Sequence, residues 1–122
     1  IQKRILMGEA TGEIDVKTLA EVSYYNLKER EGFHLMAARH HYAAILNSEP
    51  RIEKLNELTI PTLIIHGEQD PVMPIEHGKK LVATIPNVDS LWIENMGHDL
   101  PDSAIPILTE KIIRHMERVD GE

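Results

Sequence analysis

The chain has 122 residues, of which 42% are hydrophobic and 27% charged, and its formal net charge is −7. This composition is typical of one small soluble globular domain. The negative charge argues against nucleic acid and against an anionic membrane surface as partners, because both need a basic face. The absence of cysteine excludes disulfides, thiolate nucleophiles and thiolate metal sites.

No apolar run approaches the roughly 18 residues that a membrane helix needs, and the start of the chain lacks a signal-peptide pattern. We therefore expect a cytoplasmic protein that does not span a membrane. The first residue is Ile1 rather than Met. This is expected of a piece cut from a longer chain, or of a product from which an expression tag was removed.

The first half of the chain is predicted to be helical, because its apolar residues recur close to a 3.6-residue period. The expected helical segments are Ile1–Met7, Val16–Glu29, His34–Asn47 and Arg51–Leu58. Asp15 is suited to N-cap the second segment, Gly32 ends it, and Pro50 closes the third. A boundary near Pro50 divides this helical part, residues 1–50, from an α/β part, residues 51–122.

The second half predicts strands alternating with helices. The expected order is strand Thr62–His66, helix Ile75–Thr84, strand Leu91–Glu94 and helix Ala104–Arg118. The first strand lacks the polar alternation of a half-exposed strand, which indicates that both of its faces are covered. The last helix is expected to turn its large apolar residues inward, namely Ile105, Leu108, Ile112, Ile113 and Met116.

Asp70 and His98 each follow one of the two predicted strands. Parallel strands joined by a helix take a right-handed crossover, so both strands end at the same edge of the sheet. Open α/β sheets bind ligands at this carboxyl edge. The topology therefore predicts that Asp70 and His98 are neighbours in space.

The two side chains together have the chemistry of a catalytic pair. Asp70 can accept the ring N–H of a histidine, fix its tautomer and stabilise the imidazolium, while His98 can serve as base and acid near neutral pH. Each residue alone has a simpler interpretation. Asp70 precedes Pro71 and can form a turn by accepting backbone N–H groups, and His98 can be a surface residue bonded to Asp99. The pairing favours the catalytic interpretation.

Other candidate site residues carry weaker signals. Met73 and Met96 flank the two turns, and they either bind substrate or fill the core. The seven histidines raise the question of a metal site, but no His-Glu-x-x-His pattern is present. Adjacent His40 and His41 point to different sides of a helix. We expect neither a metal nor another cofactor.

Two motifs carry a family resemblance. Ile-Pro-Thr-Leu-Ile-Ile-His-Gly-Glu-Gln-Asp-Pro-Val-Met-Pro at Ile60–Pro74 is followed by Trp-Ile-Glu-Asn-Met-Gly-His-Asp-Leu-Pro at Trp92–Pro101. Together they resemble the C-terminal third of the α/β-hydrolase family, closest to small-ester hydrolases of the methylesterase and lipase-like type. The resemblance places Asp70 at the triad acid after the seventh strand and His98 at the histidine after the last strand. It implies an α/β fold: two parallel strands of a hydrolase sheet with flanking helices, preceded by a helical cap segment at residues 1–50.

The nucleophile of that family sits in Gly-x-Ser-x-Gly, and this sequence has no such motif. Its serines lack the flanking glycines: they are Ser23, Ser48, Ser90 and Ser103, the last expected to cap a helix. The resemblance thus implies the C-terminal fragment of a serine-type hydrolase of carboxylic esters. Without a nucleophile we expect the fragment to be inactive alone, with a small-molecule ester bound only in the full-length parent.

Two alternatives remain open. The chain can be a non-catalytic, hydrolase-derived module for binding or interaction. It can also be a response-type α/β domain with Asp70 as phospho-acceptor, although the usual acidic cluster is missing. The expected partners are the missing N-terminal hydrolase segment and, because a two-stranded sheet has open edges, a second copy of the chain.

Overall fold

The computed structural model describes residues 6–9, 15–30, 32 and 34–121. The chain forms two compact units, Glu13–Pro50 and a second made of Ile1–Gly12 with Arg51–Glu122. We call them the helical unit and the α/β unit. The predicted division at residue 50 differs from this arrangement in one respect, because residues 6–9 belong to the α/β unit. That residues 1–50 form a cap segment stays a prediction.

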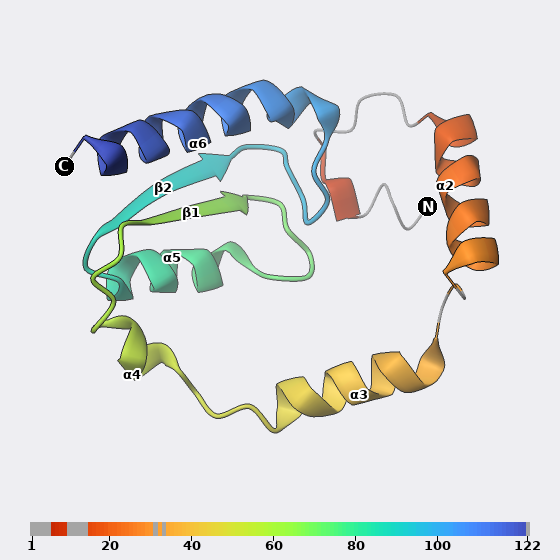
Figure 1. The fold of residues 1–122 in the computed structure, drawn as a ribbon, viewed down its shortest axis with the longest axis horizontal. Helices are drawn as coiled ribbons and strands as arrows, with labels where there is room; N and C mark the ends of the chain where they lie inside the picture. The colour runs from red at the N-terminus through yellow and green to blue at the C-terminus, as the bar shows by residue number, and fades with distance from the viewer. Residues whose placement is uncertain (1–5, 10–14, 31, 33, 122) are drawn as a thin grey trace. The chain divides into compact units, whose positions relative to one another are not determined.

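The helical unit contains α2 (Val16–Glu29) and α3 (Leu35–Leu46), shown in Figure 1. The predicted bounds of α2 are confirmed. Asp15 N-caps this helix, because its Oδ1 accepts hydrogen bonds from the backbone N–H of Lys17 at 2.9 Å and of Thr18 at 3.2 Å. Beyond its end, the N–H of Gly32 donates to the Asn26 carbonyl at 2.8 Å. Local hydrogen bonds therefore define both ends of the helix.

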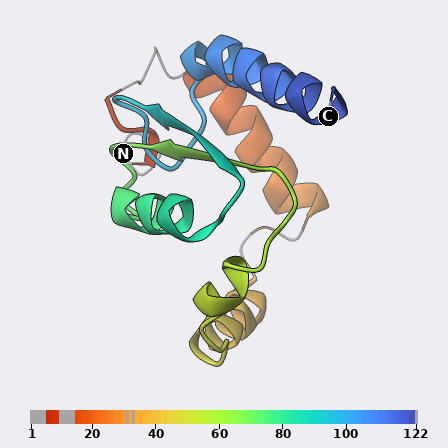
Figure 2. The same cartoon turned by 90° about the vertical axis from the view of Figure 1, so that its left-hand side faces the viewer.

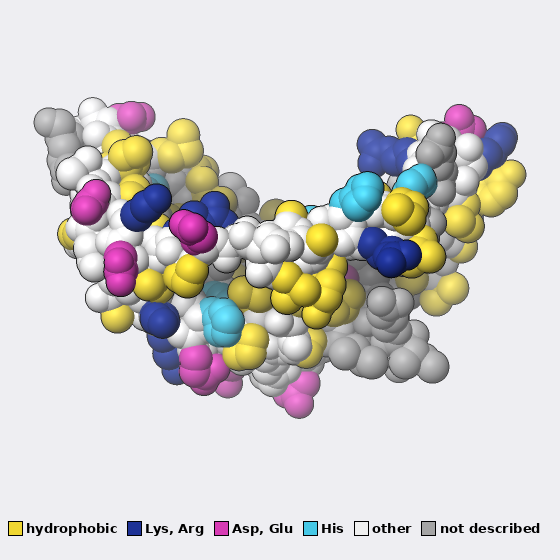
Figure 3. Space-filling model, turned by 90° about the horizontal axis from the view of Figure 1, so that it is seen from below, with side chains coloured by type: hydrophobic (Ala, Val, Ile, Leu, Met, Phe, Trp, Pro, Cys, Tyr) yellow, Lys and Arg dark blue, Asp and Glu magenta, His cyan; other side chains and the backbone are white. Residues whose placement is uncertain are grey.

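No described residue of the helical unit is buried. The large apolar side chains of α2 and α3 are instead exposed, among them Val22, Tyr24, Leu27, Tyr42 and Leu46. Figure 3 shows hydrophobic side chains at the surface over the face that it draws. The helices of this unit thus follow the predicted pattern without burying its apolar positions.

The α/β unit consists of a two-stranded parallel sheet with helices on both faces. Its elements are α4 (Ile52–Leu55), β1 (Thr62–Gly67), α5 (Ile75–Thr84), β2 (Val88–Ile93), a 3₁₀ turn (Asp102–Ala104) and α6 (Ile105–Asp120). Figures 1 and 2 both show α5 and α6 on opposite sides of the strands. This confirms an α/β fold of two parallel strands with flanking helices.

The second strand was predicted at Leu91–Glu94, but it starts at Val88 and ends at Ile93. The six residues of β1 set this length, since Thr62 pairs with Val88 and Gly67 with Ile93. The first half of β2 was not predicted, because polar Asp89 interrupts the apolar pattern of the strand. Its charge is compensated from α6, where Lys111 Nζ lies 2.7 Å from Asp89 Oδ2.

The core of the α/β unit lies between the sheet and α6. Buried Met96, Ala104 and Leu108 form this cluster. The half-buried strand residues Ile65, Leu91 and Ile93 pack against it. Successive strand residues point to opposite faces, so the alternate residues His66 and Trp92 lie against Gly78 of α5.

The inward face predicted for α6 is wrong in most positions. Leu108 is buried, but four expected core residues are exposed: Ile105, Ile112, Ile113 and Met116. Strands lie only about 4.8 Å apart, so a two-stranded sheet covers one narrow strip of the helix. Ser103 does not cap α6 either, because it lies in the 3₁₀ turn and Ala104 occupies the N-cap position. Self-association through open sheet edges stays a prediction.

Candidate functional site

The turn after β1 holds the Asp70 carboxylate in place. Asp70 Oδ1 accepts hydrogen bonds from the backbone N–H of Val72 and of Met73, both at 2.8 Å. The side chain is only 8% exposed. This is the turn-forming role expected for an Asp before a proline, and it leaves the second carboxylate oxygen for another donor.

That donor is the ring of His98, on the turn after β2. His98 Nδ1 lies 2.8 Å from Asp70 Oδ2. An ionised carboxylate only accepts hydrogen bonds, so Nδ1 carries the hydrogen and Nε2 is the basic nitrogen of the neutral ring. The His98 side chain is 45% exposed, so a reactant can approach Nε2. The structure therefore brings together the two residues that the strand order predicted to be neighbours.

The environment of Asp70 keeps its carboxylate ionised. Burial raises the pKa of Asp70, but hydrogen bonds from Met73 N–H, His98 and Val72 N–H outweigh burial and lower the pKa below its usual 3.8. The adjacent charge of a protonated His98 lowers it further. Asp70 is thus a carboxylate that accepts the hydrogen on His98 Nδ1.

Two glycines allow close backbone approaches at the site. Gly67 lets the turn that carries Asp70 (the acid turn) approach the turn that carries His98 (the histidine turn), and Gly97 lets the histidine turn approach the segment that begins at Leu6. A Cβ on Gly67 would collide with the carbonyl oxygens of Met96 and Gly97, and a Cβ on Gly97 would collide with the Leu6 carbonyl. The backbones also bond directly, because Gln69 N–H donates to Met96 O at 2.9 Å. Only glycine fits at such approaches, which explains the glycine of each motif.

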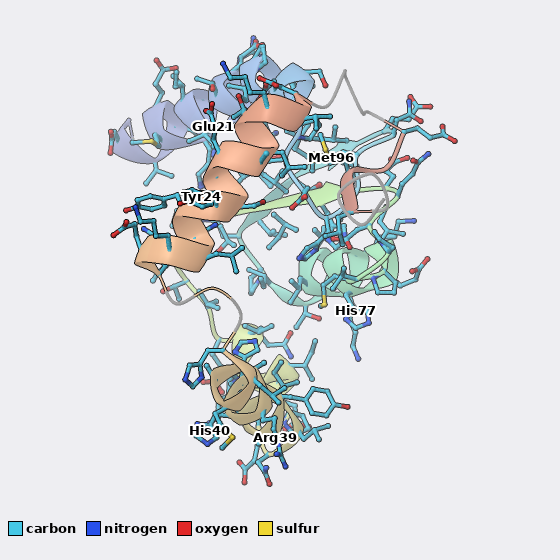
Figure 4. All side chains as sticks on the ribbon, turned by 90° about the vertical axis from the view of Figure 1, so that its right-hand side faces the viewer. Glu21, Tyr24, Arg39, His40, His77 and Met96 are labelled. Carbon is cyan, nitrogen blue, oxygen red and sulfur yellow. The ribbon has the colours of Figure 1, made fainter. Side chains whose placement is uncertain are left out.

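The two methionines predicted to bind substrate occupy different environments. Met73 is 42% exposed and lies in the acid turn. Met96 is only 7% exposed and belongs to the core cluster beneath α6; Figure 4 labels it at the end of β2. The core-filling interpretation therefore fits Met96, while substrate binding by Met73 stays a prediction.

Sequence reasoning missed His66 as part of the site. Its Nε2 bonds to the Met73 carbonyl oxygen at 2.8 Å and lies 3.9 Å from Asp70 Oδ2. Its ring thus bonds to the acid turn, and the centroids of the His66 and Trp92 rings lie 6.3 Å apart. His66 could have been found from its position one residue before Gly67, at the end of the strand that leads into the acid turn.

Two other histidines lie on separate helices. His40 projects from α3 and His77 from α5 (Figure 4). Within the part of the chain that the structure describes, no three His, Asp or Glu side chains are arranged to hold a metal ion. Nor is any described helix both long and apolar enough to cross a membrane.

Comparison with known proteins agrees with this geometry. A family model described as the alpha/beta hydrolase fold matches residues 5–104. The chain belongs to the α/β-hydrolase family. Membership fits the two parallel strands with flanking helices and the position of Asp70 and His98 after successive strands.

Individual relatives match a shorter stretch. Alpha/beta hydrolase domain-containing protein 17C of Xenopus tropicalis is 41% identical over 51 residues, which is 41% of this chain and 16% of that protein. Human protein 17C is 39% identical over the same share of each chain, and human protein 17B is 41% identical with 18% of its length covered. The chain thus matches less than a fifth of the length of these curated relatives.

Proposed function

We propose that Asp70 and His98 are the acid and the general base of a serine-type hydrolase of carboxylic esters. The observation that carries this proposal is the 2.8 Å bond between His98 Nδ1 and an ionised Asp70 carboxylate whose side chain is only 8% exposed. The bond fixes the tautomer in which Nε2 is free to accept a proton. The exposed face of His98 is where a nucleophile would lie.

In the proposed reaction, His98 Nε2 takes the proton of a serine hydroxyl as its oxygen attacks the ester carbonyl carbon. The alcohol then leaves with that proton, and an acyl-serine ester remains. Water attacks this ester by the same route, so the carboxylic acid is released and the serine is restored. Asp70 stays ionised throughout and stabilises the imidazolium.

The proposal assigns the nucleophile to a segment outside these 122 residues, because the sequence contains no Gly-x-Ser-x-Gly. Among the described residues of the α/β unit, no serine hydroxyl hydrogen bonds to His98. Ser48 donates to the Ala44 carbonyl at 2.7 Å, while Ser23, Ser90 and Ser103 lie in α2, β2 and the 3₁₀ turn. The 122-residue chain alone is therefore expected to be inactive.

The same observation favours a second candidate, a non-catalytic binding module that retains the hydrolase fold. The two candidates differ in one respect: a hydrolase needs a serine whose reactivity depends on His98, and a binding module does not. A covalent probe of serine reactivity separates them without knowledge of the substrate.

The test uses the protein as it occurs in its source, isolated with an antibody against this chain and treated with a fluorophosphonate. Mass spectrometry then locates the modified serine. We expect a serine in Gly-x-Ser-x-Gly outside the 122 residues, and labelling about 10⁴-fold slower in the Asp70→Asn version and slower still in the His98→Ala version. No labelling would support the binding module, and labelling of any of the chain's own serines would overturn the assignment of the nucleophile.

A further inference from the structure

Gln69, one residue before the acid, contacts two other segments of the site. Its backbone N–H donates to the Met96 carbonyl at 2.9 Å. Its side-chain Oε1 accepts from the Glu9 N–H at 2.8 Å, and its Nε2 donates to Asn95 Oδ1 at 3.3 Å. One residue thus bonds to the histidine turn and to a segment about 60 positions earlier in the sequence.

That early segment also bonds to the histidine turn directly. The N–H of Gly97 donates to Met7 O at 2.8 Å, and the N–H of Asp99 donates to Leu6 O at 2.9 Å. These are the two amides on either side of His98. The backbone that carries the catalytic candidate is therefore fixed on both sides by residues outside the acid and histidine motifs.

The contact between these segments leaves no space for side chains. A Cβ on Gly8 would lie 2.6 Å from Asn95 O and 2.8 Å from Gly97 N, and Gly8 has a φ of +70° that favours glycine. Asn95 also has a positive φ, +62°, at the exit from β2. Such close approach makes the position of the histidine turn sensitive to the segment Leu6–Glu9.

We propose that Gln69 is a positioning residue, which holds the His98 turn between the acid turn and the segment Leu6–Glu9. Without its side chain, Glu9 N–H and Asn95 Oδ1 lose their partners, and the two clamping bonds at Gly97 and Asp99 open more often. His98 then spends less time in hydrogen-bond contact with Asp70. The catalytic meaning of this role rests on the proposed function, but the geometry can be tested without any activity.

The test compares Gln69→Met, which keeps the length of the side chain but removes both of its hydrogen bonds, with the unaltered 122-residue chain. We expect three- to tenfold faster amide hydrogen exchange at Gly97 and Asp99, the range given by the loss of one such bond. Long-range ¹H–¹⁵N spectra should also show that His98 loses its preference for hydrogen on Nδ1. Exchange at Ile64, within the sheet, should not change.

Glu68→Met is the matched control, since Glu68 is the exposed neighbour, and it should leave all of these readouts unchanged. If Gln69→Met fails to fold, Asn95→Gly removes the Oδ1 acceptor and keeps the positive φ, and a smaller shift of the same kind is expected. Unchanged Gly97, Asp99 and His98 signals would overturn the proposal. So would an equal increase at Ile64, which would indicate general loss of stability. Neither outcome depends on ester hydrolysis, so this proposal and the proposed function can fail separately.

Discussion

The helical unit and the α/β unit are stabilised in different ways. In the helical unit, α2 is closed by Asp15 at one end and by the Gly32 bond at the other, and no described residue is buried. In the α/β unit, Met96 and Leu108 form a core, and two turns meet backbone to backbone. Local capping is thus enough to form helices here, whereas the site requires long-range packing.

The largest effect is expected at the meeting point of the two turns. Gly67→Ala should lower the free energy of unfolding of the α/β unit by roughly 2–4 kcal/mol, because the new Cβ collides with fixed carbonyl groups. Urea denaturation followed by Trp92 fluorescence measures this.

Gly121→Ala is the matched control, since the nearest atom to its Cβ is 3.2 Å away and its φ is −93°; its effect should stay within about 0.5 kcal/mol. Equal effects of the two substitutions would contradict the close approach.

A core truncation compares the two units directly. Leu108→Ala removes a buried side chain and should cost about 2 kcal/mol or more of unfolding free energy. The same change at exposed Leu27 of α2 should cost no more than about 0.5 kcal/mol. Denaturation curves of both variants measure these two losses. A larger loss of unfolding free energy for Leu27→Ala than for Leu108→Ala would contradict the expected difference between the units.

Acid should weaken the α/β unit through Asp70. Its pKa in the folded chain lies below 3.8, so its contribution is present above pH 3.8 and is lost as the pH falls through the folded value. Asp70→Asn should remove this part of the pH dependence of unfolding.

Some acid dependence of unfolding should remain in Asp70→Asn, because a hydrogen bond from Lys111 also lowers the pKa of Asp89. Urea unfolding measured across acidic pH tests both statements, and an unchanged acid dependence in Asp70→Asn would contradict the first.

The smallest effect is expected in the helical unit. Asp15→Ala removes the N-cap of α2 and should lower the helix signal in circular dichroism without changing the unfolding of the α/β unit. Thr18→Val, which deletes only the hydroxyl that donates to Asp15 Oδ2 at 2.6 Å, should have a weaker effect. A change in the α/β unit would show that the two units are not independent in stability.

Sequence reasoning succeeded where the signal was local. The ends of α2 could be predicted from Asp15 and Gly32, and α5 was predicted residue for residue at Ile75–Thr84. The meeting of Asp70 and His98 is not local, since the two are 28 positions apart, but it was predicted because parallel strands joined by a helix end at one edge of the sheet.

It failed where partners distant in the sequence decide. The start of β2 depends on its pairing with β1 and on Lys111, which compensates Asp89. The exposure of Ile112 depends on the width of the sheet, and the roles of His66 and Gln69 depend on side-chain contacts across turns. None of these has a periodic signal in the sequence.

The central claim is that Asp70 holds His98 with hydrogen on Nδ1 and a free Nε2. Long-range ¹H–¹⁵N correlation on the ¹⁵N-labelled chain, at a pH where the ring is neutral, measures the tautomer directly. We predict that His98 carries its hydrogen on Nδ1 and that Asp70→Asn abolishes this preference. Hydrogen on Nε2, or the same spectrum in Asp70→Asn, would contradict the account.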